Sequence, residues 1–157
     1  VEALRAGRTP HPAARERFAR PTPRVREAQW LRERGVPTAM VDLSDGLAGD
    51  AAHLAAASGV AVLLVPELIP VHPAARERSR VRSLRRALGG GEDYELCFTA
   101  PVGAVHPYHR AFEQAFRVRL SCVGRAGGGD GVWFVDAEGH RRPTGVAAWQ
   151  HFGGGSS

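Results

Sequence analysis

The sequence predicts an α+β fold in which a mixed β-sheet is covered by helices, giving α/β/α layers. Two observations lead to this prediction. Segments rich in β-forming residues alternate with segments in which apolar residues recur at helical spacing, and glycine or proline separates them. The chain of 157 residues is also long enough for one domain with a buried core, since 43% of it is hydrophobic. One sheet covered by helices is the simplest architecture for this order of elements.

The clearest unit lies between residues 36 and 65. The segment VPTAMVDL, residues 36–43, is a strand candidate, and the SDG that follows it breaks the strand. From Leu47 onward, small and apolar residues recur at helical spacing, and Gly59 is well placed to end that helix. The apolar run at 60–65 then predicts a second, buried strand. Such a unit predicts a right-handed crossover between two parallel strands.

The same alternation continues along the chain. After a proline-rich loop we expect a helix at 75–88, a strand at 94–99, a helix at 105–116, a strand at 118–124 and a hairpin at 132–143. Short helices at 1–7 and 12–18, with proline-rich links, precede the first strand. We therefore expect three parts, which are a helical and proline-rich lead-in at 1–35, a domain at 36–152 and a flexible tail at 153–157.

Composition and charge exclude several kinds of chemistry. All 21 basic residues are Arg, so neither a P-loop lysine nor a Schiff-base lysine exists in this chain. The net charge is +5, but the arginines are mixed with glutamates in helical stretches, which favours solvated helix faces over a nucleic-acid groove. No apolar run approaches the roughly 18 residues of a membrane span, and no signal peptide is evident. We expect a cytoplasmic protein that binds neither nucleic acid nor membrane.

The cysteines and histidines give no metal signature. Cys97 and Cys122 each lie in an apolar, β-like run without Cys-x-x-Cys spacing, so we expect two buried and inert thiols. Four histidines could suggest a metal, but we expect none to be a ligand because no partner carboxylate stands at ligand spacing; these are His53, His72, His106 and His109.

The first chemically informative motif is DLSDG, residues 42–46. Asp42 lies at the carboxyl end of a predicted strand, where ligands of α/β sheets tend to bind, and Asp45 follows across a tight turn. Two carboxylates there suit Mg²⁺, while Ser44 offers a hydroxyl to a phosphate. Gly46 permits close approach, and the N-terminus of the following helix favours anions. The alternative interpretation is that Ser44 or Asp45 is an ordinary N-cap, which leaves Asp42 unexplained.

The second motif is GGGEDYEL, residues 89–96. Three glycines allow the backbone to approach a ligand, and Glu92 and Asp93 then stand at the start of a strand. The alternative is a flexible turn with solvated acids. Two motifs that each place acids beside glycine at a sheet end are more informative together than either is alone.

In combination, these segments resemble the carboxyl-terminal half of thiamine-monophosphate kinase. The resemblance covers residues 20–152 and rests on RPTPRV, AMVDLSDGLAGDAAHLAAASGVAV, LIPV, ALGGGEDYELCFTAP and the terminal WQHF. The wider superfamily contains aminoimidazole ribonucleotide synthetase, selenophosphate synthetase and a hydrogenase-maturation factor. The resemblance implies the fold of the carboxyl-terminal domain of aminoimidazole ribonucleotide synthetase-like proteins.

The resemblance also implies an activity and a set of residue roles. The family transfers the γ-phosphoryl group of ATP to thiamine monophosphate, which gives thiamine diphosphate. By motif, Asp42 and Asp45 would bind Mg²⁺ and Ser44 would contact the nucleotide phosphates. Glu92 would contact thiamine monophosphate, and Trp149 would pack on it. No residue of this half is implied as a general base.

Two departures from the family pattern qualify these expectations. The terminal motif usually reads Gly-aromatic-Asp-His-Phe, and this chain has Ala148 and Gln150 in place of the glycine and the acid. The family's amino-terminal domain, with further acidic Mg²⁺ ligands, much of the nucleotide site and most of the homodimer contact, has no counterpart here. We therefore expect weak or no kinase activity from this chain alone. The alternatives are a domain of a related ATP-dependent synthetase and a non-catalytic binding module that retains the fold.

Overall fold

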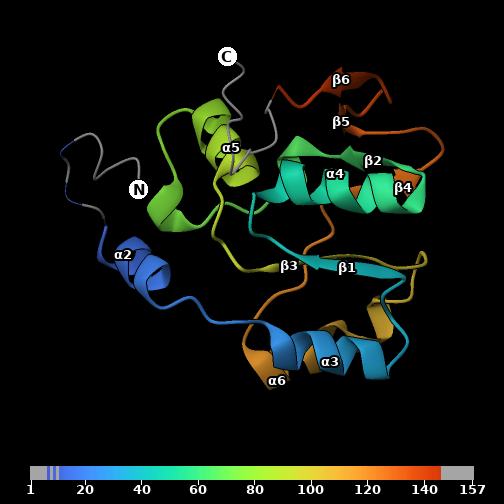
Figure 1. The fold of residues 1–157 in the computed structure, drawn as a ribbon, viewed down its shortest axis with the longest axis horizontal. Coiled ribbons are helices and arrows are strands. Elements are labelled where there is room, and N and C mark those ends of the chain that lie inside the picture. Colours follow the sequence, from blue (N-terminus) through green and yellow to red (C-terminus); the bar gives the residue numbers. More distant parts are fainter. Residues whose placement is uncertain (1–6, 8, 10, 146–157) are drawn as a thin grey trace, which may run out of the picture.

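The computed structural model describes residues 7, 9 and 11–145. Its helices are α2 (Pro12–Ala19), α3 (Val25–Glu33), α4 (Leu47–Ser58), α5 (Arg80–Gly89) and α6 (His109–Phe116), with short 3-10 turns at Pro66–Leu68, Pro73–Ala75 and His106–Tyr108 (Figure 1). Its strands are β1 (Ala39–Asp42), β2 (Ala61–Leu64), β3 (Leu96–Thr99), β4 (Gly124–Gly127), β5 (Val132–Val135) and β6 (Arg141–Pro143). Most of the helix expected at 1–7, together with Trp149 and the tail at 153–157, lies outside the described residues.

The described strands form two sheets. β1 pairs with β3 in an antiparallel, two-stranded sheet, and the other sheet has the order β4-β2-β5-β6. Within the latter, β2 and β5 are parallel and the remaining neighbours are antiparallel. The expected α+β fold with a mixed sheet is therefore confirmed. The expected single sheet and the parallel crossover from β1 to β2 are wrong.

The reason for two sheets lies in α4. Its buried positions spread over more than one face of the helix, because alanine and glycine occupy much of its surface. It contacts β1 and β3 as well as β2 and β5, and so separates the two sheets instead of covering a single one (Figure 1). The helix begins after Gly46 and ends at Gly59, whose φ of 61° is left-handed, as the sequence predicts.

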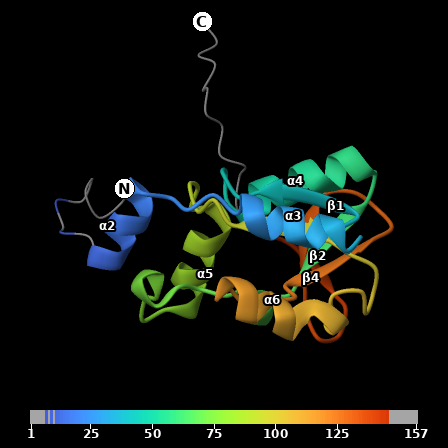
Figure 2. The same ribbon diagram turned by 90° about the horizontal axis from the view of Figure 1, so that it is seen from below.

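The described residues form three buried clusters, one of which contains Ala61, Leu63 and Val135 of the four-stranded sheet. The other two lie next to the β1–β3 sheet. One surrounds α4 and the four-stranded sheet and contains Leu64 and Leu88, each 1% exposed. The other lies on the opposite side of the β1–β3 sheet, under α3 and α6, where Leu31 and Phe112 are buried (Figure 2). In this second core Trp30 packs edge-on against the aromatic rings of α6 and its lead-in. Helix α3, which precedes residue 36, therefore shares a core with the following segments.

Some local predictions differ from the structure. The strand expected at 118–124 is replaced by β4, which begins at Gly124, where an added Cβ would lie 2.1 Å from the Leu63 carbonyl oxygen. Only glycine permits that close approach to the backbone of β2. Cys97 is half-buried in β3, and burial raises the pKa of its thiol to about 11. Cys122 is exposed, so the expectation that it is buried is wrong.

Among the described residues, no helix is both long and apolar enough to cross a lipid bilayer.

Candidate functional site

The two acidic glycine motifs lie side by side. Beyond the last register pair of the two-stranded sheet, Leu43 N–H donates to the Glu95 carbonyl oxygen and Tyr94 N–H donates to the Leu43 carbonyl oxygen, both at 2.8 Å. Glu92 N–H then donates to the Ser44 carbonyl oxygen, also at 2.8 Å. These bonds continue the β1–β3 pairing into the motifs. Both motifs therefore meet at one end of this sheet.

Glycine makes the close approach possible. An added Cβ on Gly46 would lie 2.6 Å from the Leu88 carbonyl oxygen, and one on Gly91 would lie 2.6 Å from the Ser44 carbonyl oxygen. Real Cβ atoms do not approach backbone oxygens so closely, and Gly46 also has a φ of 95°. The segments around residues 46 and 91 are therefore in backbone contact, with no room for a side chain between them.

The second motif contains backbone strain. Glu92 has a φ of 68° and Tyr94 a φ of 50°, which are left-handed values that residues with a Cβ rarely adopt. Each such residue costs about 1 kcal/mol or more, and it persists only where neighbouring contacts fix it. Here the contacts are the hydrogen bonds of the Glu92 and Tyr94 amides to the first motif.

The start of α4 is organised by a residue that the sequence analysis did not assign. The N-cap is Gly46 without a side-chain cap bond, so the N-cap interpretation of Ser44 or Asp45 is wrong. Instead, the Asp50 carboxylate, in a residue only 2% exposed, accepts a 3.0 Å hydrogen bond from the Asp45 N–H. Burial raises the pKa of Asp50, and the bonds from the Asp45 and Ser44 backbone oppose that rise. The chain's own carboxylate thus occupies the anion-favouring end of the helix.

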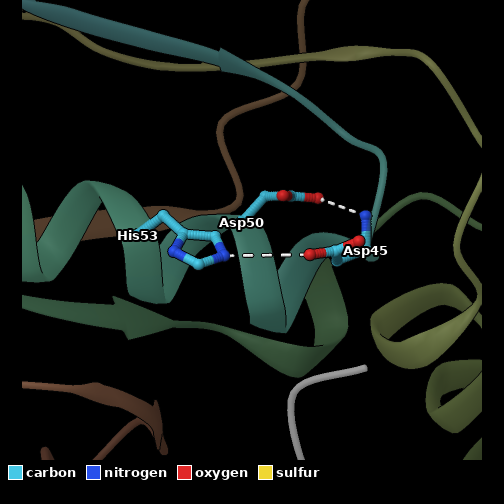
Figure 3. A group of neighbouring side chains, drawn as sticks. All are labelled: Asp45, Asp50 and His53. Carbon is cyan, nitrogen blue, oxygen red and sulfur yellow. Dashed lines mark hydrogen bonds and ion pairs between the residues drawn. The ribbon is translucent and has the colours of Figure 1, made fainter. Parts of the chain in front are cut away.

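Asp45, Asp50 and His53 form one cluster of possible metal ligands (Figure 3). Their ligand atoms all lie within 4.8 Å of one another, and His53 Nε2 is 3.8 Å from an Asp45 carboxylate oxygen. The expectation that no histidine has a partner carboxylate at ligand spacing is therefore wrong for His53. Asp50 lies one helical turn before it, so the two residues are neighbours on the surface of α4.

Asp42 faces a different environment. It is the exposed last residue of β1 and lines a groove of about 590 Å³ between α3 and the β1–β3 sheet. Tyr94 and Leu96 of the second motif line the same groove, as does Arg24. The groove is mostly apolar, and Asp42 is its acidic group. The first motif therefore presents Asp42 beside the groove, and Asp45 beside α4.

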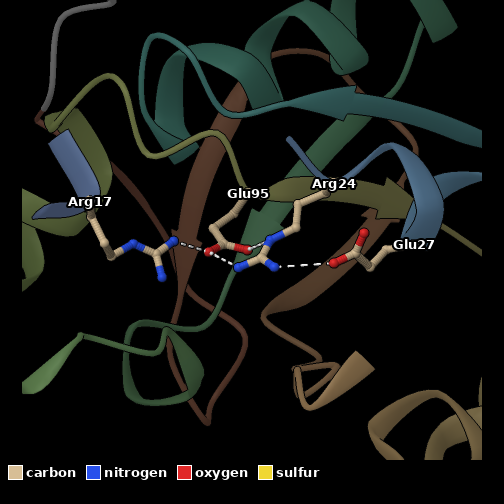
Figure 4. A network of polar contacts seen from close by, with 4 residues as sticks. All are labelled: Arg17, Arg24, Glu27 and Glu95. Atoms are coloured by element: carbon tan, nitrogen blue, oxygen red, sulfur yellow. Dashed lines mark hydrogen bonds and ion pairs between the residues drawn. The ribbon is translucent and has the colours of Figure 1, made fainter. Parts of the chain in front are cut away.

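A network of ion pairs attaches the lead-in to the second motif (Figure 4). The Arg24 guanidinium donates to both carboxylate oxygens of Glu95 at 2.9 Å, and its third nitrogen donates to Glu27 at 3.1 Å. Arg17 of α2 also pairs with Glu95. Burial alone would raise the pKa of Glu95, but the two arginines hold it below its usual value.

The structure thus brings together the backbones that carry Asp42, Ser44, Asp45 and Glu92, while Trp149 lies outside the described residues. Three further polar residues of this region had no role assigned from the sequence, which are Arg24, Asp50 and Glu95, and His53 was not expected to be a ligand. Asp50 carried a signal, because it stands three residues after Leu47 and four before Leu54, on the apolar side of the helix. Arg24 lies in RPTPRV and Glu95 in GGGEDYEL, but nothing local indicated their pairing, since it joins segments 71 residues apart.

In architecture, the described chain is an α+β domain with an acidic, glycine-containing corner at the end of a two-stranded sheet. No model of a known protein family matches it. It is 45% identical to thiamine-monophosphate kinase of Salmonella typhimurium over 87 residues, which are 55% of this chain and 26% of the relative. A crystal structure of thiamine-monophosphate kinase from Stenotrophomonas maltophilia matches with a TM-score of 0.74 and 35% identity, over 85% of this chain and 44% of that one.

A solved structure of AaThiL complexed with AMPPCP and TMP matches with a TM-score of 0.73 and 29% identity, over 96% of this chain and 46% of that one. Sequence and structure thus agree that the chain is homologous to part of thiamine-monophosphate kinase. It spans between about a quarter and a half of the length of these proteins.

Proposed function

We propose that this chain is the carboxyl-terminal domain of a thiamine-monophosphate kinase, with its domain at 36–152, and that it forms one wall of the phosphoryl-transfer site. The backbone contact between the two acidic glycine motifs supports this proposal most strongly, because a hydrogen bond joins Glu92 of one motif to Ser44 of the other. The similar proteins are thiamine-monophosphate kinases, and one solved structure contains AMPPCP, an ATP analogue, with TMP. ATP and thiamine monophosphate are therefore the proposed ligands, and the complete enzyme is proposed to be cytoplasmic and homodimeric.

The residue roles follow from the chemistry of each side chain. Asp42 and Asp45 hold Mg²⁺, and the Ser44 hydroxyl donates to a phosphate oxygen of the nucleotide. Glu92 is exposed next to this corner and accepts hydrogen bonds from thiamine monophosphate. Trp149 packs on the substrate, where a flat aromatic face suits a cationic thiazolium ring. The chain contributes binding and orientation, and it contributes no general base.

The residues fit Mg²⁺ by their donor chemistry. Mg²⁺ takes oxygen ligands, commonly one or two carboxylates together with phosphate and water. The carboxylate of half-buried Asp45 and that of exposed Asp42 are such donors, and Asp50 fixes the turn between them through the Asp45 amide. When bound, the metal neutralises charge on the phosphates during phosphoryl transfer.

Calorimetric titration of thiamine monophosphate into the chain, with and without Mg²⁺, tests this proposal. We expect Mg²⁺-dependent binding that weakens at least about tenfold in the double variant Asp42→Ala/Asp45→Ala, because loss of groups that support a metal site typically weakens metal affinity about 10- to 100-fold. Asp130→Ala, which removes an exposed acid in the glycine turn before β5, is the matched control and should bind as the wild type does. Equal Mg²⁺-dependent binding in all three proteins would show that the acids are structural only.

A turnover assay addresses the activity. We expect little or no phosphorylation of thiamine monophosphate by the purified chain, because the family's further acidic ligands are not in it. Robust turnover by the chain alone would contradict this expectation. Preferential binding of an aminoimidazole ribonucleotide precursor or of selenide would instead move the assignment to a related synthetase.

A further inference from the structure

The segment from Glu92 to Glu95 needs an external constraint to keep its conformation. It contains the two left-handed residues of the second motif, Glu92 and Tyr94, and its amides bind the first motif. The segment is exposed or half-buried along its length, so apolar packing contributes little to fixing it. Glu95 is the last residue of this segment, and its carboxylate is hydrogen-bonded to Arg24 of the lead-in (Figure 4).

Two arginines bind the Glu95 carboxylate: Arg17 of α2 forms one ion pair with it, and Arg24 binds both of its oxygens. The two parallel 2.9 Å hydrogen bonds make a bidentate pair, which fixes the plane of the carboxylate as well as its position. Arg24 is itself held, because its side chain is only 13% exposed and its remaining nitrogen binds Glu27, the side chain of which is 10% exposed. Both groups belong to the start of α3, which is anchored in the core through Leu31.

The strand pairing transmits this constraint to both motifs. The backbone carbonyl of Glu95 accepts from the Leu43 amide, so a fixed Glu95 fixes the residue before Ser44. The next two bonds, from Tyr94 to Leu43 and from Glu92 to Ser44, alternate along the same pairing. The Arg24–Glu95 pair therefore lies at one end of a short ladder that ends at Glu92.

We propose that Arg24 is a positioning residue: through its bidentate pair with Glu95 it holds the segment from Glu92 to Glu95 in its left-handed conformation, and so orients the Glu92 carboxylate toward a ligand at the acidic corner. The expected effect of Arg24 on the binding of thiamine monophosphate rests on the proposed function. The expected effect of Arg24 on the backbone conformation of the segment does not.

Amide hydrogen exchange of the full chain, followed by NMR, tests the proposal residue by residue. In Arg24→Gln we expect the Glu92 and Tyr94 amides to exchange at least about tenfold faster than in the wild type, because local opening becomes easier. The Val62 amide, which donates to the Gly131 carbonyl in the other sheet, should keep its protection. Arg24→Lys keeps the positive charge but loses the two-pronged guanidinium, so its exchange rates at Glu92 and Tyr94 should lie between those of the wild type and Arg24→Gln. This variant remains informative if Arg24→Gln does not fold. Arg26→Gln, an exposed arginine on the same helix, is the matched control.

The same proteins are then titrated with thiamine monophosphate and Mg²⁺. We expect Arg24→Gln to bind thiamine monophosphate about tenfold more weakly than the wild type, because it loses both the charge and the bidentate contact. Arg24→Lys keeps the charge, so its affinity should lie between the two. Wild-type protection at Glu92 and Tyr94 in Arg24→Gln, or an equal loss at Val62, would overturn the proposal, as would unchanged affinity. If the wild type does not bind thiamine monophosphate but the exchange pattern is as expected, the proposed function fails and the positioning role stands.

Discussion

The two sheets of the molecule are stabilised in different ways. All four residues of β2 are buried, and this strand lies between two neighbours in the four-stranded sheet. None of the residues of β1 is fully buried, and its sheet has only two strands among the described residues. A two-stranded sheet is marginal by itself, so the β1–β3 sheet depends on α3, α4 and the ion pairs at Glu95. The proposed site therefore lies where polar contacts and close backbone packing, more than apolar burial, determine the conformation.

The largest effect is expected from the four-stranded sheet. Leu64→Ala removes a side chain that is 1% exposed in the core around α4, and should lower the free energy of unfolding by about 2–5 kcal/mol. Met40→Ala, in half-buried β1, should cost less than half as much, because less apolar surface is lost there. Urea denaturation followed by circular dichroism measures both. Equal losses in the two variants would remove the distinction between the sheets.

The next effect concerns the glycine contact between the motifs. Gly46→Ala combines a left-handed φ with a Cβ 2.6 Å from the Leu88 carbonyl oxygen, so we expect a loss of about 2–3 kcal/mol in the free energy of unfolding. Gly59→Ala is the matched comparison, since its φ of 61° is also left-handed but nothing lies within 4 Å of the added Cβ. It should cost only about 1 kcal/mol. Thermal unfolding of the two variants would show whether the clash adds to the strain.

These contrasts explain what could be predicted from the sequence. The α4 helix, its end at Gly59 and the strand at β2 were predictable, because helical spacing, a C-terminal glycine and a continuous apolar run are local signals. The two sheets were not, because the partner of β1 is β3, more than fifty residues along the chain, and nothing in β1 specifies it. In the site, the acids of both motifs stood out by their glycine neighbours, whereas no local signal indicates that Arg24 and Glu95 pair on folding.

A smaller effect is expected from Asp50, which supports the first motif from within α4. Asp50→Ala leaves the Asp45 amide without this acceptor, and should cost about 1–3 kcal/mol in the free energy of unfolding. Asp50→Asn should cost less, because an amide oxygen still accepts a hydrogen bond and the neutral group suits a buried position. Denaturation in metal-free buffer measures both, with Asp130→Ala as an exposed control. A larger loss in the Asn variant than in the Ala variant would contradict this role.

The smallest effect is a pH dependence of the ion pair at Glu95. The pKa of this carboxyl is lowered in the folded chain from an ordinary value of 4.5, although burial alone would raise it, because Arg24 and Arg17 bind the charged form. Between the two pKa values the unfolded chain binds more protons, so the contribution to stability is present above the ordinary pKa and is lost as the pH falls through the folded one. The pKa of the neighbouring Asp93 is raised by burial, so Asp93 contributes to the pH dependence of stability with the opposite sign. Because Asp93 is present in both proteins compared below, its contribution cancels in their difference.

The measurement is the free energy of unfolding of the wild type minus that of Glu95→Gln, as a function of pH. This difference should be largest near neutral pH and should shrink as the pH falls below 4.5, because protonation makes the two side chains alike. Added salt should reduce it only in part, since the Arg24 partner is mostly buried. A difference that stays constant across this pH range would mean that the charge of Glu95 does not hold the second motif. The β1–β3 sheet would then depend on backbone pairing and on the contacts of α3 and α4 alone.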